Sequence, residues 1–265
     1  MLILGMGYTA SRLATRLRGE GWHVTGVRRA ADADALAFDD DDAVRTSIAQ
    51  ATHILSSVPP GGEADPVLTR YGAAIAAAPA LWSGYLSSTG VYGDAAGAWV
   101  DEDSPIGSGR RAGRVQADRD WRALREDMRC FRLPGIYGPG RSAIERVREG
   151  KAHRIDLPDQ IFSRAHVDDI VSGIIASFNG PPGAYNLADD LPCAQNRLIE
   201  GACAMLGAPL PPLLTLEEAR LSPMALSFYA ENRRVANGRA KRLLGWKPRY
   251  PTYREGLSAC LAGAE

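Results

Sequence analysis

The chain has 265 residues, of which 31 are acidic, 31 are basic and 45% are hydrophobic. This length suits one large α/β domain, or one domain with a subdomain. The balanced charge argues against a nucleic-acid surface and a polybasic membrane anchor. The four cysteines are scattered without a C-x-x-C pair. We therefore expect a cytoplasmic protein with reduced thiols, no metal site and no signal peptide or membrane span.

The start of the chain predicts a strand, a glycine turn and a helix. The apolar run Leu2–Leu4 leads into G-x-G-x-x-A at residues 5–10, and a helical pattern covers Thr9–Gly19. This order is typical of the first βαβ unit of a dinucleotide-binding fold. The pyrophosphate of the cofactor would rest on the free N–H groups at the start of the helix. The cofactor-binding residues expected here are Gly5, Gly7, Tyr8, Thr9 and Ala10.

Two arginines follow the second expected strand, His23–Val27. An acidic residue at this point would bind the ribose 2′-OH of NAD, whereas Arg28 and Arg29 suit the additional 2′-phosphate of NADP. We therefore predict NADP as the cofactor and consider NAD less favoured. The acidic run Asp39–Asp42 reads as a solvated loop, with a contact of Asp39 near the adenine as the functional alternative.

Short apolar runs alternate with helical patterns, which predicts a mostly parallel sheet covered by helices. The fold class is therefore α/β, a doubly wound parallel sheet of the Rossmann type. We expect this core over residues 1–150, and over 151–265 a mixed segment that completes the core and forms a small substrate-binding cap. Further strands are expected at His53–Val58, Gly84–Ser87, Cys130–Leu133 and Ala184–Leu187, and helices at Pro66–Ala78, Arg111–Glu126, Ser142–Glu149 and Val167–Phe178.

Ligands of such a sheet bind beyond the carboxyl ends of its strands. The segments at the ends of the expected strands are therefore further candidates for cofactor binding. They are Ser57, Val58 and Pro59, and Pro134, Gly135, Ile136 and Tyr137.

Four motifs resemble those of the extended short-chain dehydrogenase/reductases, the NAD(P)-dependent epimerase/dehydratase-like family. They are S-S-x-x-V-Y-G at 87–93, R-x-x-x-x-Y-G-P-G at 132–140, H-V-x-D at 166–169 and L-G-W-x-P at 244–248. The resemblance covers nearly the whole chain. It implies that Ser88 is the catalytic Ser or Thr, which hydrogen-bonds a substrate carbonyl or hydroxyl, with Thr89 as the neighbouring alternative.

The chain departs from this family at the catalytic Y-x-x-x-K motif. Arg110 overlays the Tyr position and Arg114 the Lys position. Arginine stays protonated near neutral pH, so Arg110 cannot transfer a proton, although it can bind an anion. Arg114 is expected to contact the nicotinamide ribose. Tyr92 and Tyr137 are the candidates to replace the missing tyrosine.

His166 and Asp168 could form a catalytic pair. We favour the interpretation that this segment begins a helix, with Asp168 in the first turn where a carboxylate interacts well with the helix dipole. Arg164 nearby is a candidate anion contact.

These features predict an NADP-dependent oxidoreductase or epimerase/dehydratase that acts on a small polar or nucleotide-sugar-like molecule. The alternative is a sensor or regulatory protein that binds NADP but has lost the chemistry. The resemblance implies a homodimer as a possible assembly, and neither a nucleic acid nor a membrane is expected as a partner.

Overall fold

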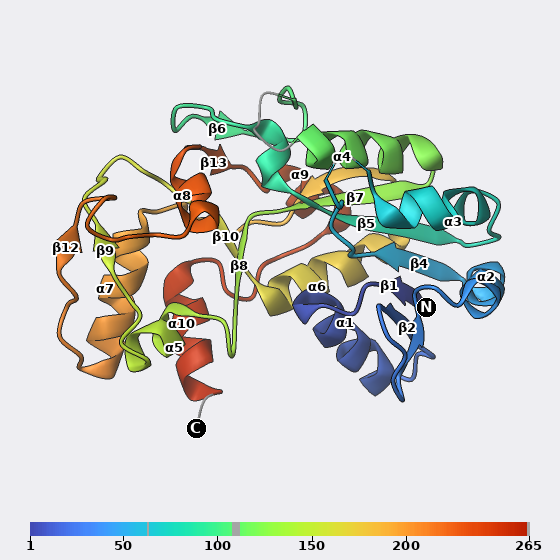
Figure 1. Cartoon of the computed structure of the whole chain (residues 1–265), viewed down its shortest axis with the longest axis horizontal. Coiled ribbons are helices and arrows are strands. Elements are labelled where there is room, and N and C mark those ends of the chain that lie inside the picture. Colours follow the sequence, from blue (N-terminus) through green and yellow to red (C-terminus); the bar gives the residue numbers. More distant parts are fainter. Residues whose placement is uncertain (63, 108–111, 264–265) are drawn as a thin grey trace.

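The computed structural model describes residues 1–62, 64–107 and 112–263, so Arg110 lies outside the described residues. Seven parallel strands form one sheet in the order β11-β7-β5-β4-β1-β2-β3 (Figure 1). The strand order reverses direction at β1, which is where α/β sheets bind ligands. The strands are β1 (Leu2–Leu4), β2 (Thr25–Arg28), β3 (Ala35–Ala37), β4 (His53–Ser56), β5 (Trp82–Ser88), β7 (Met128–Leu133) and β11 (Gly183–Asn186).

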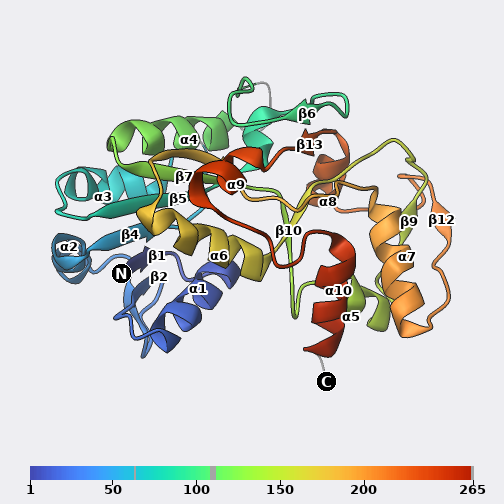
Figure 2. The same cartoon turned by 180° about the vertical axis from the view of Figure 1, so that it is seen from behind.

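Helices cover both faces of this sheet (Figures 1 and 2). One face carries α2 (Asp41–Gln50), α3 (Pro66–Ala76) and α4 (Ala112–Leu124), and the other carries α1 (Tyr8–Gly19), α6 (Val167–Ala176) and α9 (Gly238–Leu244). The expected doubly wound α/β fold is therefore confirmed.

Strand β1 shows how the sequence builds these two layers. Alternate side chains of a strand point to opposite faces of the sheet. Leu2 and Leu4 accordingly join the apolar cluster under α2, α3 and α4, while Ile3 joins the cluster under α1 and α6. All three are buried, as expected of a central strand in a parallel sheet covered on both faces.

A smaller cap stands beside the sheet, at the left of Figure 1. Its core is an apolar cluster that includes Ile144, Ile199 and Leu257. The helices of this cluster are α5 (Ala143–Arg148), α7 (Gln195–Leu206) and α10 (Tyr253–Ala262). Helix α5 thus already packs with the cap, although it precedes residue 151.

Short elements complete the fold. Three pairs of short strands lie outside the main sheet, and α8 and two 3₁₀ turns lie in connections. They are β8 (Gly135–Tyr137) with β10 (Arg164–His166), β9 (Arg154–Ile155) with β12 (Leu213–Leu214), β6 (Trp99–Val100) with β13 (Arg234–Val235), α8 (Pro223–Tyr229), η1 (Thr89–Tyr92) and η2 (Ser177–Asn179).

The expectation of a solvated loop at Asp39–Asp42 was wrong, because this run starts α2. The Asp40 side chain accepts a hydrogen bond from the Ala43 N–H, and Asp41 and Asp42 occupy the first helical turn. Acidic side chains are favourable at a helix N-terminus, where the backbone N–H groups are unpaired. The acidic run was therefore a helix-start signal.

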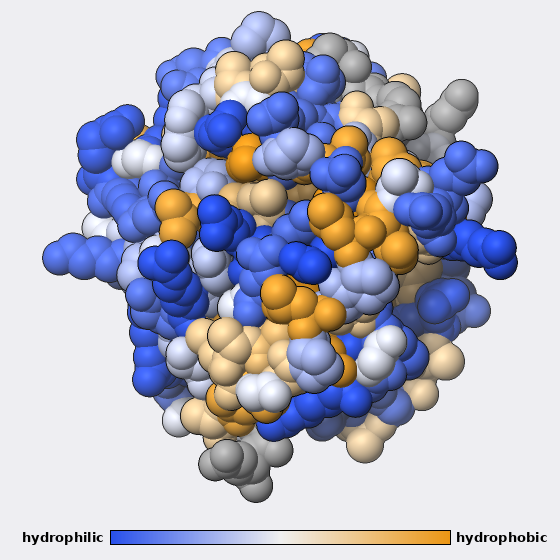
Figure 3. Space-filling view, turned by 90° about the vertical axis from the view of Figure 1, so that its left-hand side faces the viewer, coloured by the Kyte–Doolittle hydropathy of each residue, from blue (hydrophilic) through white to orange (hydrophobic). Residues whose placement is uncertain are grey.

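The outer surface is mixed in character. From the cap side, apolar side chains form separate patches among hydrophilic ones (Figure 3). Within the described ranges, no helix combines the length and the apolar character that a membrane crossing needs.

Candidate active site

The turn after β1 can hold only glycine at its first position. Gly5 has a φ of 92°, and a Cβ atom there would lie 2.7 Å from Cγ2 of Val58. The Ser57 hydroxyl donates a hydrogen bond to the Gly5 carbonyl at 2.6 Å. Ser57 and Val58 therefore fix the turn from the neighbouring strand, which is a positioning role that the sequence did not predict.

Gly7, by contrast, faces open space. It is the N-cap residue of α1, with a φ of −83° and no side-chain capping hydrogen bond, and a Cβ atom there would meet nothing within 4 Å. The first turn of α1 contains no acidic residue. Unpaired N–H groups and the helix dipole make such an N-terminus a site for an anion. The residues present therefore fit a dinucleotide pyrophosphate, while Ala10 packs in the core under α1.

A cavity of about 670 Å³ begins at this turn and runs past the carboxyl ends of β4, β5 and β7 into the cap. Most of the predicted cofactor and catalytic residues lie in its wall. Those that line it are Gly7, Tyr8, Thr9, Ser57, Pro59, Ser88, Thr89, Arg114, Pro134, Gly135 and Ile136.

Ser88, Thr89 and Arg114 lie together in the cavity wall. Ser88 ends β5, and its Oγ accepts a hydrogen bond from the Gly90 N–H at 3.2 Å. Because Oγ acts as an acceptor in this bond, the hydroxyl hydrogen remains available to donate to a ligand. Arg114 reaches the wall from the first turn of α4.

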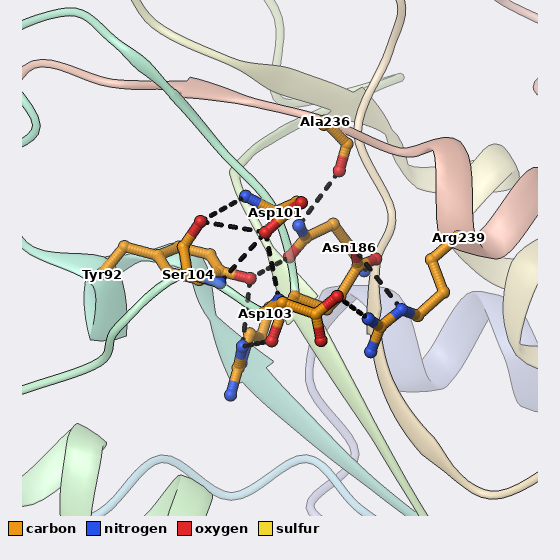
Figure 4. A network of polar contacts seen from close by, with 9 residues as sticks. Tyr92, Asp101, Asp103, Ser104, Asn186, Ala236 and Arg239 are labelled. Atoms are coloured by element: carbon orange, nitrogen blue, oxygen red, sulfur yellow. Dashed lines mark hydrogen bonds and ion pairs between the residues drawn. The ribbon is translucent and has the colours of Figure 1, made fainter.

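Tyr92, predicted as catalytic, lies away from this cavity. It is buried, and its hydroxyl donates to Asn186 Oδ1 at 2.8 Å and accepts from Arg132 Nη1 at 3.1 Å (Figure 4). Burial raises the pKa of Tyr92 to about 12, and the charge of Arg132 opposes this shift. The position of Tyr92 supports a structural role in a buried polar network.

Tyr137 is also buried elsewhere. Its ring packs in the cap cluster against Gly256 of α10, where a Cβ atom would collide with it. Burial raises the pKa of the Tyr137 hydroxyl, which has no hydrogen-bond partner among the described residues. The tyrosines in the cavity wall are instead Tyr8, whose hydroxyl donates to the Pro139 carbonyl at 2.9 Å, and Tyr229 of α8.

The residues predicted to select the cofactor lie at the far edge of the site. Arg28 ends β2 and forms an ion pair with Asp32. Arg29 is exposed and makes no hydrogen bond or ion pair with a described residue. Asp39 is exposed as well, and its carbonyl accepts a hydrogen bond from Arg70 at 3.0 Å. None of the three predicted residues lines the cavity.

His166 and Asp168 agree with the helix-start interpretation. His166 is the N-cap residue of α6, and its Nδ1 accepts a hydrogen bond from the Asp168 N–H at 3.3 Å. The Asp168 carboxylate pairs with Arg12 of α1 at 2.8 Å. Burial lowers the pKa of His166 to about 4, so the ring is neutral near pH 7. Neither side chain lines the cavity.

The cap contributes wall residues that the sequence analysis missed. They come from the turn before α5, α5 itself, the segment before β9, α7 and α8, and no motif links these elements along the chain. The missed residues include Arg141, Arg146, His153, Gln195 and Tyr229. No cluster of three or more His, Cys, Asp or Glu side chains in the described segments could hold a metal ion.

Comparison with known proteins places this geometry in context. No protein-family model matches the chain. A 3-diazoavenalumate denitrifying reductase from Streptomyces sp. is 32% identical over 142 residues. This match covers 48% of the chain but only 45% of that reductase, so it spans less than half of the relative.

Two of the solved structures that match nearly the whole chain are the following. A functionally unknown conserved protein from Silicibacter pomeroyi DSS is 42% identical, with a TM-score of 0.91 and coverage of 99% of this chain and 98% of that one. A putative NAD-dependent epimerase/dehydratase from Methylobacillus flagellatus is 25% identical, with a TM-score of 0.77 and coverage of 99% and 97%. The chain therefore belongs to the same family as the Silicibacter pomeroyi protein, and its fold is that of the epimerase/dehydratase-like short-chain dehydrogenase/reductases.

Proposed function

We propose that the protein is an NADP-dependent oxidoreductase that reduces a small substrate held under the cap. The observation that carries the proposal is a juxtaposition within one cavity. The open helix N-terminus at Gly7, which fits a pyrophosphate, shares the cavity with Ser88, Thr89 and Arg114. A cofactor whose pyrophosphate is bound at Gly7 would extend its nicotinamide end towards Ser88, Thr89 and Arg114.

Each part of the wall has a role in this proposal. The N–H groups at the start of α1 bind the pyrophosphate. Arg114 hydrogen-bonds the nicotinamide ribose, and the segment Pro134–Ile136 forms the wall beside the nicotinamide. When bound, the cofactor supplies a hydride to an electrophilic substrate carbon.

Ser88 then orients and polarises the substrate. Its free hydroxyl hydrogen donates to the substrate oxygen or nitrogen, where negative charge develops as the hydride arrives. Water entering through the cavity supplies the proton that completes the reduction. This assignment needs no tyrosine at the family position, which falls at Arg110, outside the described residues.

Two observations support the choice of NADP as the cofactor and of reduction as the reaction. The exposed Arg29, which follows β2 directly, has no ion-pair partner among the described residues and lies where the 2′-phosphate of NADP would bind. The Streptomyces relative is named as a reductase, although it matches only part of the chain.

The decisive experiment measures the transfer of deuterium from the cofactor to a product. The protein is incubated with NADPH deuterated at C4 and a panel of aldehydes, ketones and nucleotide sugars, and products are analysed by mass spectrometry. We expect transfer to at least one compound and a loss of about 10²-fold in kcat with Ser88→Ala.

The same experiment separates an enzyme from a sensor. Tight NADPH binding without transfer to any compound would favour the sensor. Absence of NADPH binding in a fluorescence titration would end the proposal altogether.

A further inference from the structure

Among the described residues that line the cavity, positive charges outnumber negative ones. Of the described wall residues, five are arginines and one is a glutamate, Glu231. Glu231 is already paired with Arg233 at 2.8 Å. In the proposed function, Arg114 serves the cofactor, and Arg141 lies over the ring of Tyr8 beside the pyrophosphate site. Arg146 and Arg164 therefore remain for a substrate.

Arg164 is a buried cation with two vacant donors. It is only 5% exposed, and it lines the cavity from β10. Its Nη1 donates to the carbonyl oxygens of Phe162 and Cys193, at 3.0 and 3.1 Å, and its Nη2 donates to Gln195 Oε1 at 2.9 Å. A guanidinium has five N–H groups, so Nε–H and one Nη2–H remain.

Nε and Nη2 lie on one edge of the guanidinium; within the described residues Nε has no hydrogen-bond partner, and Nη2 has only Gln195. Nε is not sealed from solvent, although most of the residue is buried. The pair has the spacing that a carboxylate needs for two parallel hydrogen bonds. No carboxylate of the described chain lies within 4 Å of it. A buried arginine with this side vacant is a preformed anion-binding group.

Arg146 adds a second positive charge on the same side of the cavity. It projects from α5, and the only hydrogen bond of its guanidinium to a described residue is a long one of 3.5 Å, to the Lys151 carbonyl. The phenol of Tyr229 lies in the field of both arginines. Burial raises the pKa of Tyr229, and Arg146 and Arg164 both oppose that shift. Both cations line the same cavity as Tyr229.

Aromatic rings flank this point. The rings of Phe162 and Tyr229 meet edge to face, with centroids 5.5 Å apart and an angle of 86°. The guanidinium carbon of Arg164 lies 5.7 Å from the centroid of Phe162. Such a wall favours a planar apolar group directly beside an anion. The volume of about 670 Å³ must also hold the reactive end of the cofactor, which limits the substrate to a small one.

We propose that the cap half of the cavity binds a small aromatic carboxylic acid, with its carboxylate on Nε and Nη2 of Arg164 and its ring against Phe162 and Tyr229. Arg146 strengthens the attraction without direct pairing. This inference rests on the proposed function for the chemistry, but the binding itself requires no turnover. Arg164 thus acts as a specificity residue.

The test compares two probes of one shape. trans-Cinnamate and its neutral amide, trans-cinnamamide, are titrated calorimetrically into the protein with and without NADP⁺. We expect cinnamate to bind with a Kd of about 1 mM or lower. The amide should bind at least about tenfold more weakly, because it cannot form the charge-assisted pair.

Gln195→Glu tests the role of Arg164 without removing it. The new carboxylate oxygen occupies the place of the amide oxygen that Arg164 already contacts, so the fold is retained while the cation is neutralised. We expect cinnamate binding to fall at least about tenfold and cinnamamide binding to stay unchanged. Arg146→Gln should weaken cinnamate binding a few-fold. Arg148→Gln, on the same helix but outside the cavity wall, is the matched control.

The outcomes separate the two proposals. Equal binding of the two probes, no binding of either, or cinnamate binding that is unaffected by Gln195→Glu would each overturn the aromatic-acid site and leave the oxidoreductase proposal standing. Failure to bind NADP⁺ would overturn the oxidoreductase proposal, while the titration without cofactor would still report on the cap.

Discussion

Asp118 in the sheet core and Asp189 beneath the cap are both buried, yet their surroundings differ in kind. Asp118 accepts hydrogen bonds from Arg132, Ser87 and Cys130, and its charge is matched by the guanidinium of Arg132 at 2.9 Å. Asp189 has two carboxylate oxygens without a hydrogen-bond partner in the described part of the chain. Its N–H donates to the carbonyl of Arg164 at 2.7 Å, so it lies directly behind the cap wall.

The pKa values of the two carboxyls shift in opposite directions. Burial alone would raise the pKa of Asp118, but the hydrogen bonds and charge of Arg132 outweigh burial and lower it. Burial raises the pKa of Asp189 to about 7, and Arg164 only partly opposes the shift. Asp118, whose hydrogen bonds are satisfied, belongs to the core of the sheet. Asp189, whose carboxylate oxygens lack partners, lies next to the part of the cavity where a ligand is proposed to bind.

Asp118→Asn should have the largest effect on stability. It leaves the guanidinium of Arg132 buried without a counter-charge, which typically costs about 3–5 kcal/mol. Urea denaturation at pH 7 measures this loss. Asp120→Asn, on the exposed side of the same helix, should change stability by no more than about 0.5 kcal/mol. Equal effects of the two changes would show that the buried pair does not stabilise the fold.

Asp189→Asn should stabilise the protein above neutral pH. The pKa of this group is about 7 in the folded state and 3.8 in its ordinary environment, so its ionisation disfavours folding. The free energy of unfolding therefore falls as pH rises from about 4 to about 7, and the full cost persists above that range. At pH 8 the substitution should add as much as about 4 kcal/mol. An unchanged pH profile would contradict this assignment.

Gly7→Val and Gly5→Ala should separate cofactor binding from folding. A side chain at Gly7 enters open space and blocks the pyrophosphate, so NADPH affinity should fall about 100-fold, or about 2.8 kcal/mol, with stability unchanged. Alanine at Gly5 must adopt a positive φ and collide with Val58, which should cost about 1–3 kcal/mol of stability. Fluorescence titration and thermal melting measure the two effects. Normal NADPH binding by the Gly7→Val variant would contradict the assignment of Gly7 to the pyrophosphate site.

Arg29→Ala should weaken NADPH binding more than Arg28→Ala does. Arg29 is unmatched, whereas Arg28 must leave Asp32 to bind a phosphate. We expect a tenfold to hundredfold loss for Arg29→Ala, about 1.4–2.8 kcal/mol, with NADH affinity unchanged. Equal losses for both cofactors would contradict recognition of the 2′-phosphate.

Tyr92→Phe should have the smallest effect. Removing the hydroxyl leaves Asn186 and Arg132 each with one hydrogen bond fewer, which should cost about 1 kcal/mol of stability. Because Tyr92 lies outside the cavity wall, kcat should stay as in the wild type, in contrast to Ser88→Ala. A large loss of kcat with Tyr92→Phe would restore the catalytic role predicted from sequence.

The core of the fold could be predicted because its signals are local. Gly5 and Gly7 follow one strand directly, and the alternation of apolar runs and helices fixes the sheet and its layers. The motif around Ser88 likewise lies at the end of a strand, so its place at the ligand-binding edge follows from the topology. Strand ends and the fold class are therefore readable from short stretches of sequence.

The cap wall could not be predicted for the opposite reason. Arg146, Gln195 and Tyr229 line one cavity only after elements from three distant segments pack together, and Arg164 alone of the cap arginines was predicted, as an anion contact. The directions in which the side chains point could not be predicted from the sequence either. Tyr92 and Tyr137 both lie near the correct edge of the sheet, but packing turns one towards Asn186 and the other into the cap cluster.

The path of the chain between the cap and the sheet affects how the molecule responds to proteolysis and to thermal unfolding. The chain enters the cap with α5, returns to the sheet with α6, and repeats this alternation with α7, α9 and α10. Neither part is a continuous stretch, so no single proteolytic cut releases an autonomous piece. Melting should be one cooperative event, and any molecule that fills the cap should protect the nucleotide half from heat as well.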